Sequence, residues 1–223
     1  MSDYDFHRAS LLRRTKNEGT LMKIALFGAS GMIGSRVVAE AAARGIEVTA
    51  ITRSGTEVAG ASRSLTGDMA DADLAARMAA EHDVIVSTTG PSRTGGDHQE
   101  WLDALDTLAE ISGDTRLFIV GGAGSLFAGN TMLKDTEGFP DAYKAEAETG
   151  TKALELLRAK NPSPWTLISP APEIGPGERT GKYSSELEVP AGDFISAEDF
   201  AVAMVDEIAD PIHIDARFTV ANR

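Results

Sequence analysis

From residue 22 to the C-terminus, short runs of β-branched and apolar residues alternate with longer segments in which apolar residues recur every three or four positions. The short runs are typical of buried strands, and the longer period is typical of amphipathic helices. Glycines and other turn residues separate most of these segments. The predicted strands are residues 23–27, 47–52, 64–66, 84–88, 117–120, 166–169 and 217–220, and the predicted helices are residues 32–44, 71–81, 99–112, 141–160 and 197–209.

Strands that alternate with helices predict an α/β fold, with a doubly wound, mainly parallel sheet and helices on both faces. Residues 22–223 suffice for a single domain with a large core and small C-terminal elements on the substrate side. Residues 1–21 show no periodicity and are interpreted as an extension: an upstream start, a cloning remnant, a disordered tail or a short docked helix. Ligands of such sheets bind at the carboxyl ends of the strands, here after residues 27, 52, 66, 88, 120 and 169.

A glycine-rich loop lies between the first predicted strand and the first predicted helix. Gly28 allows a tight turn, Gly31 lets the backbone approach a pyrophosphate, and Gly34 lets the helix pack closely on the strand. The pyrophosphate of a dinucleotide would lie at the helix N-terminus, where free amides and the helix dipole favour an anion. The alternative is an ordinary strand-to-helix turn. The predicted cofactor contacts of this loop are Gly28, Ala29, Ser30, Gly31, Met32, Ile33 and Gly34.

The second predicted strand is followed by Arg53 and Ser54. In sites specific for NAD an acidic residue near this position binds the ribose hydroxyls, whereas an arginine accommodates the 2′-phosphate of NADP. A guanidinium can form a forked, charge-assisted pair with a phosphate. We therefore predict NADP(H) as the preferred cofactor, with NAD(H) possible, against the alternative that Arg53 is an ordinary surface arginine.

The amino-acid composition excludes several kinds of catalytic and binding site. The chain has no cysteine, which excludes disulfides and thiol catalysis, and its four histidines lack metal-ligand spacing, so no metal site is predicted. A net charge of −13 disfavours binding to nucleic acid or to an anionic membrane. No apolar run approaches the roughly 18 residues that span a bilayer. We expect a cytoplasmic protein, monomeric or homodimeric.

Several segments are similar to one superfamily. GASGMIGSRV, FIVGGAGSL, WTLISPAPEIGPGERTGKY and ISAEDFAVAMVDEI resemble the atypical short-chain dehydrogenases/reductases, close to the NmrA-like and the biliverdin-IXβ and flavin reductase-like branches. Bacterial proteins described as NADH-flavin reductases show the same segments. The resemblance covers residue 22 to the C-terminus, and it implies a three-layer Rossmann-type fold with a nicotinamide cofactor.

The resemblance also implies further cofactor contacts. Asp68 and Met69 would contact the adenine, although Asp68 could instead cap the next helix. Thr88, Thr89 and Gly90 would line the path toward the nicotinamide, with simple packing at the strand end as the alternative for the two threonines. Pro170 and Ala171 would flank the nicotinamide, and Gly121 is a further predicted cofactor contact.

The catalytic pattern of the superfamily is incomplete in this sequence. The usual Tyr-x-x-x-Lys pair lowers the pKa of the tyrosine, but Tyr143 is followed four residues later by Ala147. The serine expected after the fifth strand arrives late, as Ser125, and a backbone-bonded loop serine is an equal alternative. Glu173 lies near the position of a histidine in the biliverdin and flavin reductase branch, where it could relay a proton or simply face solvent. The candidate catalytic residues are Ser125, Tyr143 and Glu173.

A broken Tyr–Lys pair favours an acceptor that needs little acid catalysis from the protein. The predicted function is an NAD(P)H-dependent reductase that transfers hydride to a planar acceptor, a flavin or quinone, with flavin as substrate and not as a tightly bound cofactor. The alternative is a non-catalytic NADP(H)-sensing regulator of NmrA-like type; an epimerase would need the intact pair. Residues 92–98 and 173–193 are candidate lids, and the candidate stacking residues are Phe127 and Tyr183, ahead of Trp101.

Overall fold

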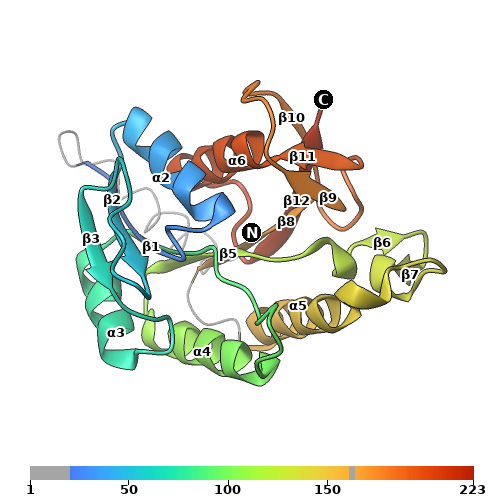
Figure 1. Cartoon of the computed structure of the whole chain (residues 1–223), viewed down its shortest axis with the longest axis horizontal. Coiled ribbons are helices and arrows are strands. Elements are labelled where there is room, and N and C mark those ends of the chain that lie inside the picture. Colours follow the sequence, from blue (N-terminus) through green and yellow to red (C-terminus); the bar gives the residue numbers. More distant parts are fainter. Residues whose placement is uncertain (1–20, 161–163) are drawn as a thin grey trace, which may run out of the picture.

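The computed structural model describes residues 21–160 and 164–223, so the predicted extension lies almost entirely outside the described residues. Helices and strands alternate along the first half, and shorter strands accumulate toward the C-terminus (Figure 1). The elements are β1 (Lys23–Phe27), α2 (Met32–Ala43), β2 (Glu47–Thr52), β3 (Arg63–Thr66), α3 (Ala72–Glu81), β4 (Val84–Ser87), α4 (His98–Ile111), β5 (Arg116–Val120), the 3-10 turn η1 (Ala123–Ser125), β6 (Phe127–Ala128), β7 (Thr131–Met132), the 3-10 turn η2 (Leu133–Asp135), α5 (Asp141–Lys160), β8 (Trp165–Pro170), β9 (Glu173–Gly175), β10 (Tyr183–Glu186), β11 (Phe194–Ser196), α6 (Ala197–Ala209) and β12 (Ala216–Asn222).

Eight strands form the central sheet in the order β10-β12-β8-β5-β4-β1-β2-β3. Seven of them are parallel, and the edge strand β10 is antiparallel to β12. The chain moves outward from β1 to β2 and β3, then returns to the other side of β1 for β4, β5 and β8. This reversal is the topological switch point of a doubly wound fold, and it confirms the predicted α/β class with a mainly parallel sheet.

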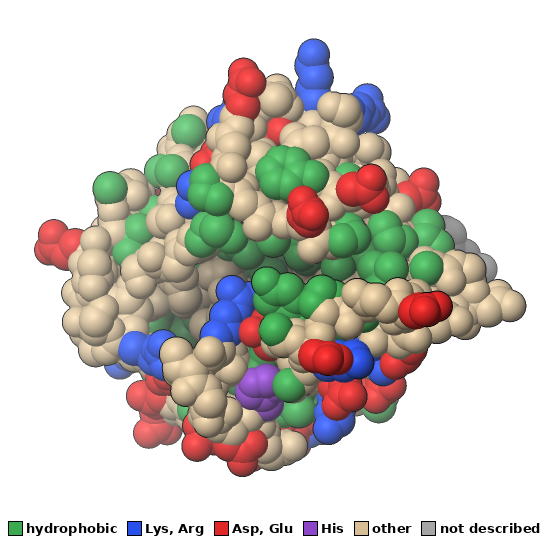
Figure 2. All heavy atoms as spheres, turned by 45° about the vertical axis from the view of Figure 1, so that its right-hand side comes forward, with side chains coloured by type: hydrophobic (Ala, Val, Ile, Leu, Met, Phe, Trp, Pro, Cys, Tyr) green, Lys and Arg blue, Asp and Glu red, His purple; other side chains and the backbone are tan. Residues whose placement is uncertain are grey.

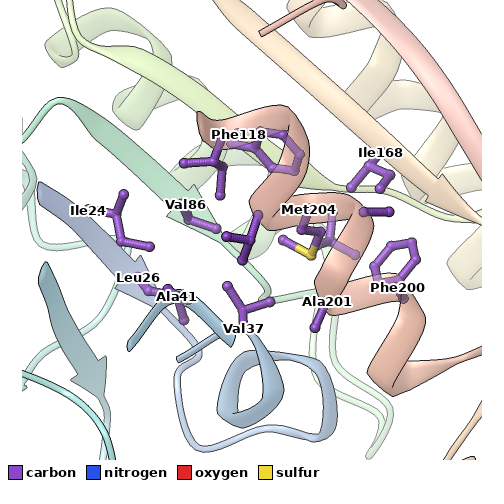
Figure 3. Close-up of a cluster of buried hydrophobic side chains, with 14 of the residues drawn as sticks. Ile24, Leu26, Val37, Ala41, Val86, Phe118, Ile168, Phe200, Ala201 and Met204 are labelled. Atoms are coloured by element: carbon purple, nitrogen blue, oxygen red, sulfur yellow. The ribbon is translucent and has the colours of Figure 1, made fainter. Parts of the chain in front are cut away.

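Helices cover the sheet on both faces, which gives three layers (Figure 1). Alternation along β1 divides its side chains between two cores: Ile24 and Leu26 pack toward α2 and α6, and Ala25 and Phe27 pack toward α3, α4 and α5. Figure 3 shows the first of these cores, in which Met204 lies among residues of the sheet and of α2. Strands of a parallel sheet are buried on both faces, which explains their nearly continuous apolar sequences.

Side chains cap three of the helices but not the first described one. Asp71 accepts a hydrogen bond from the Leu74 amide at the start of α3, and Asp97 accepts one from the Gln99 amide at the start of α4. Ser196 caps α6 in the same way. The residue at the corresponding position of α2 is Gly31, which has no side chain to offer. The N-terminal amides of α2 therefore remain available for a ligand.

All twelve predicted helices and strands are present, with ends that shift by one or two residues. The prediction missed the β6–β7 hairpin, β9, β10, β11 and the two 3-10 turns. These elements are two to four residues long, and β9 and β10 find their partners, β11 and β12, many positions later, so local periodicity carries little signal for them. The corrected boundaries are the end of α2 at Ala43, α4 at His98–Ile111, and the end of β4 at Ser87.

A buried ion pair joins the sheet to α6. The Arg116 guanidinium donates to Glu207 Oε1 at 2.9 Å and to Thr166 Oγ1 at 2.7 Å, and both charged side chains are almost fully buried. Burial lowers the pKa of Arg116 to about 10, which the Glu207 carboxylate opposes. Glu207 also accepts hydrogen bonds from the amides of Ile212 and His213. One carboxylate therefore holds both the arginine and the turn that leads into β12.

Replacing Glu207 should be strongly destabilising. We expect Glu207→Gln to lower the free energy of unfolding by about 3–5 kcal/mol, because it leaves the Arg116 charge buried without a counter-ion. Glu110→Gln removes an exposed partner of Lys160 and should cost about 1 kcal/mol or less. Urea unfolding of both variants measures the difference. Equal losses would show that the buried pair has no special role.

Candidate functional site

The loops after β1 and β4 lie side by side at the switch point. Phe27 and Ser87 are register partners at the ends of these strands, so the glycine loop and the segment Thr88–Gly90 leave the sheet together. The amides of Gly28 and Ala29 donate to the Ile51 carbonyl on β2, at 3.1 and 3.3 Å. This crevice is where a doubly wound sheet binds its ligand.

Glycine is required at two positions of the loop. Gly28 has a φ of +81°, which side chains rarely tolerate. A Cβ on Gly34 would lie 2.2 Å from the Gly28 carbonyl oxygen and 2.8 Å from Thr88 Oγ1. The first turn of α2 is therefore pressed directly onto the backbone of the loop, as the close helix–strand packing predicted from the sequence requires.

The end of α2 that faces the crevice is suited to an anion. The Ser35 amide makes the first helical hydrogen bond, to the Gly31 carbonyl at 3.0 Å, so the amides of Met32, Ile33 and Gly34 precede it. No acidic residue lies in the first turn, and Ser30 and Met32 are exposed. Free amides and the positive end of the helix dipole converge here, so the loop fits a pyrophosphate.

The predicted threonines at the end of β4 turn their hydroxyls inward. Thr88 Oγ1 donates to the carbonyl oxygens of Phe27 and Gly28, at 3.0 and 3.1 Å. Thr89 Oγ1 accepts from Trp101 Nε1 at 3.0 Å and contacts Ser87 Oγ at 2.8 Å. These hydroxyls hold the loops in place, and Trp101 anchors α4 to β4. Trp101 is thus a packing residue, the alternative weighed against a role in stacking.

At the adenosine end, Arg53 is exposed and has no ion-pair partner among the described residues. Ser54 beside it contacts Thr56 through its hydroxyl. Asp68 is exposed, and its carboxylate accepts from the Ala70 amide at 3.0 Å, while Asp71 provides the helix cap proposed as the alternative role of Asp68. A free guanidinium in an acidic protein is available for an anionic ligand.

Three further residues predicted near the cofactor are partly or fully packed. Met69 is buried, and its sulfur accepts a hydrogen bond from Ser87 Oγ. Ala171 packs in the core between the sheet and α6. A Cβ on Gly121 would meet Leu167 Cδ2 at 2.5 Å, so this glycine serves the packing of β5 on β8. Any contact of Met69 or Ala171 with a cofactor would involve mainly their backbone atoms.

Ser125 is held in the interior. The residue is 4% exposed, and its hydroxyl accepts from Arg217 Nη1 at 3.0 Å. Arg217 is itself buried and also pairs with Glu188, which bridges to Arg158 on α5. This network fixes the turn η1 between the sheet, α5 and the segment after β10. The predicted catalytic serine therefore has a structural partner, which lies 92 positions away in the sequence.

The helix that would carry a Tyr–Lys pair has Ala147 in place of the lysine, and this alanine packs against another element. A Cβ on Gly124 would lie 2.5 Å from Ala147 Cβ, so the turn η1 packs tightly against position 147. Tyr143, one turn earlier, is 59% exposed, and Lys144 pairs with Asp141 at 2.6 Å. Tyr143 is thus exposed beside a lysine that is already paired, and position 147 carries no charge, which agrees with the incomplete pattern in the sequence.

The two candidate lids are anchored to the body. In the first, the ring of His98 bonds to the Ser92 carbonyl at 2.9 Å and to Thr149 Oγ1 at 2.8 Å, which ties residues 92–98 to α5. In the second, Arg179 forms a bidentate pair with Glu40 on α2, with both distances 2.8 Å. Residues 176–183 therefore run along α2 and α6 as a strap held by this pair, and a role of the segment as a lid stays a prediction.

The predicted stacking residues separate in the structure. Tyr183 packs against the α2–α6 core, and its hydroxyl donates to Asp206 at 2.8 Å. Desolvation raises the pKa of Tyr183 well above its usual value, with the hydrogen bond to Asp206 acting in the same direction. The residue is thus engaged with α6, and its role in stacking stays a prediction. Phe127 is half-buried in the β6–β7 hairpin, its amide bonded to the Glu188 carbonyl. Glu173 is exposed at the start of β9.

Figure 2 shows a hollow between an upper and a lower lobe, with hydrophobic side chains gathered along its margins. A separate polar cavity of about 300 Å³ lies between η2 and the first turns of α5. It contains none of the predicted cofactor residues, so we place the cofactor at the glycine loop and not in this cavity. Its lining residues are Lys134, Asp135, Thr136, Lys144 and Glu148.

The geometry of the glycine loop agrees with a family comparison. A family model described as NAD(P)H-binding matches residues 28–211. The chain belongs to this NAD(P)H-binding family. The match begins at Gly28, and it confirms the resemblance to the atypical short-chain dehydrogenases/reductases. The family match supports a nicotinamide cofactor.

Relatives of this NAD(P)H-binding chain share its length and fold. The Bacillus subtilis protein YwnB is 35% identical over 212 residues, which cover 90% of this chain and 99% of YwnB. A Burkholderia pseudomallei structure, named as an exported protein, is 40% identical with a TM-score of 0.80, covering 90% of this chain and 100% of the other. A Streptococcus pneumoniae structure, named as an NADH-flavin reductase, is 32% identical with a TM-score of 0.80, covering 91% and 100%.

Residues 21–160 and 164–223 contain neither a candidate metal site nor a helix that could span a membrane. No group of three or more potential ligands could hold a metal ion there. No helix in the same ranges has the length and apolar character to cross a membrane.

The close contact at Gly34 leads to a testable expectation. Gly34→Ala should weaken NADPH binding at least about tenfold and destabilise the fold by about 1–3 kcal/mol, because the new methyl group must displace the loop backbone. Gly150→Ala in α5 is the control: its Cβ would lie 3.9 Å from the nearest atom, and it should be neutral or stabilising. Fluorescence titration with NADPH and urea unfolding measure both effects. Unchanged NADPH affinity in Gly34→Ala would remove the loop from the cofactor site.

Proposed function

We propose that this protein is an NADPH-dependent reductase that transfers hydride to a planar acceptor, such as a flavin or quinone, taken from solution. The observation that carries the proposal is the combination of a glycine loop that fits a dinucleotide with a helix that has Ala147 in place of the lysine of the Tyr–Lys pair. The dinucleotide site would supply the reductant, NADPH. The missing Tyr–Lys pair disfavours acceptors that need an acidic group of the protein as proton donor.

The residues of the switch point fit the cofactor. The amides of Met32, Ile33 and Gly34 would hold the pyrophosphate, and Arg53 would hold the 2′-phosphate of NADP. Arg53 is free of ion pairs within the described ranges, whereas Arg36 and Arg44 on the nearby α2 are both occupied by carboxylates. This difference singles out Arg53 as the cation available to the nucleotide.

When bound, the reduced nicotinamide supplies a hydride. The protein contributes position: the packed loops after β1, β4 and β5 form a rigid floor, and rigid placement of two reactants is itself a large source of rate. A flavin or quinone also takes up one proton, on a heteroatom that water can protonate. Because water can supply this proton, neither Ser125 nor Tyr143 needs to take part.

The comparisons support a reductase without naming the acceptor. The Streptococcus pneumoniae relative named as an NADH-flavin reductase is 32% identical over nearly its full length. The competing proposal is a regulator that binds NADP(H) without turnover. Anaerobic mixing of the protein with NADPH and a series of flavins and quinones distinguishes them: oxidation of NADPH supports the reductase, and tight binding without oxidation supports the regulator.

Arg53 should determine the preference for NADPH. We expect Arg53→Ser to raise the Kd for NADPH about 10–100-fold, because a charge-assisted hydrogen bond to phosphate contributes about 1.5–3 kcal/mol. The Kd for NADH, which has no 2′-phosphate, should change by less than about threefold. Arg77→Ser, which removes an exposed guanidinium from α3, is the matched control and should affect neither cofactor. Equal weakening of NADPH and NADH by Arg53→Ser would exclude a role at the 2′-phosphate.

Tyr143 should be dispensable for turnover. Tyr143→Phe removes the hydroxyl and keeps the ring, and we expect kcat with riboflavin or a quinone to fall by less than about threefold. A true general acid contributes about 10²–10⁴-fold. Steady-state kinetics with NADPH measure the effect. A loss of a hundredfold or more would identify Tyr143 as the proton donor and overturn the solvent-protonation mechanism.

A further inference from the structure

The ribbon formed by β9 and β11 presents an aromatic ring beside a carboxylate. Phe194 is the register partner of Glu173 in this parallel pair. The next pair, Ile174 and Ile195, packs on the α2–α6 core, so strand alternation turns Glu173 and Phe194 to the opposite, outer face. Phe194 is 41% exposed. The ring and the carboxylate are therefore neighbours on a surface that follows the carboxyl end of β8.

The carboxylates of this ribbon have no counter-ions. Glu173 and Asp193 are exposed, and neither has an ion-pair partner in the part of the chain that the structure describes. The two residues are adjacent, because the Glu173 amide donates to the Asp193 carbonyl at 3.0 Å. Glu188, in the same part of the chain, is instead neutralised by Arg158 and Arg217. The start of the ribbon thus carries two uncompensated negative charges.

Cations near the N-terminal end of α5 are already paired. Lys144 pairs with Asp141 at 2.6 Å, and Lys134 pairs with Asp135 at 2.8 Å. Arg93, from the loop after β4, pairs with Glu146 at 3.2 Å. Figure 2 shows hydrophobic side chains along the hollow, carboxylates on its upper lobe, and Lys or Arg side chains at its lower margin. These paired cations offer little attraction to a phosphate.

The site therefore has a positive charge, Arg53, at one end and two negative charges, Glu173 and Asp193, at the other. Arg53 follows β2, and the ribbon follows β8, with β1, β4 and β5 between them. Four strand spacings of about 4.8 Å separate β2 from β8 by about 19 Å, well beyond the screening length of about 8 Å at physiological salt. A 2′-phosphate at Arg53 and an acceptor at the ribbon would experience independent local fields.

We propose that the acceptor is an uncharged planar ring, of the riboflavin or quinone type, that stacks near Phe194, and that Glu173 and Asp193 discriminate against phosphorylated flavins. This inference rests on the proposed reductase function. An aromatic side chain favours a flat ring by stacking, and the phosphate of a flavin mononucleotide would be repelled by the two carboxylates. The reaction is the same for both flavins: NADPH and one proton reduce the ring to its dihydro form and leave NADP⁺.

The test compares riboflavin with flavin mononucleotide as acceptors for the NADPH-loaded protein at low ionic strength. We expect kcat/KM to favour riboflavin by about tenfold or more. Glu173→Gln/Asp193→Asn should bring the ratio within about threefold, mainly by lowering KM for flavin mononucleotide. The control Glu155→Gln/Asp210→Asn removes two exposed charges elsewhere and should leave the ratio unchanged. Raising the salt to about 0.5 M should also reduce the preference of the wild-type protein.

Each outcome decides between the two proposals. Equal or better turnover of flavin mononucleotide by the wild-type protein, or an unchanged ratio in Glu173→Gln/Asp193→Asn, would overturn the charge discrimination and leave the reductase function standing. If neither flavin nor any quinone is reduced, the reductase function fails. Equilibrium dialysis of both flavins against the NADP⁺-loaded protein then decides the discrimination separately: tighter binding of riboflavin supports it, and equal binding overturns it.

Discussion

The contact between the first turn of α2 and the loop before it governs the rest of the site. Gly34 lies against the Gly28 carbonyl, and the Thr88 hydroxyl joins the same loop to β4. This packing fixes the N-terminal amides of α2 at the switch point, without a capping side chain to occupy them. A larger residue at either glycine would move the helix away from the strand, and the anion site would lose its geometry.

Beyond that contact, side-chain pairs join the two candidate lids to the helices beside them. The strap at residues 176–183 is bound to α2 through Arg179, and the loop before α4 is bound to α5 through His98. Glu188 joins α5 to β12. A reductase that relies on placement and not on a strong acid benefits from such fixed walls. The proposed mechanism requires that the two reactants be held in place, and the observed packing can provide such walls.

Local sequence predicted the features that depend on local spacing. The glycine loop, the twelve main elements and the broken Tyr–Lys spacing all lie within short segments. Features that depend on distant partners escaped prediction: Ser125 bonds to Arg217, and Tyr183 bonds to Asp206 through an element that the sequence did not reveal. The packing at Ala147 is likewise invisible locally, because its close neighbour Gly124 comes from another element.

The position of β12 has a consequence for how the chain folds during synthesis. β12 is the last element of the sequence, yet it lies inside the sheet between β8 and β10. Until β12 has been synthesised and has paired, β8 has an open edge and β10 has no partner, so this side of the sheet forms last. The cofactor half, built around β1, β2 and β4, can assemble earlier. A nascent or C-terminally shortened chain would therefore expose an unpaired strand edge, which is a site for aggregation.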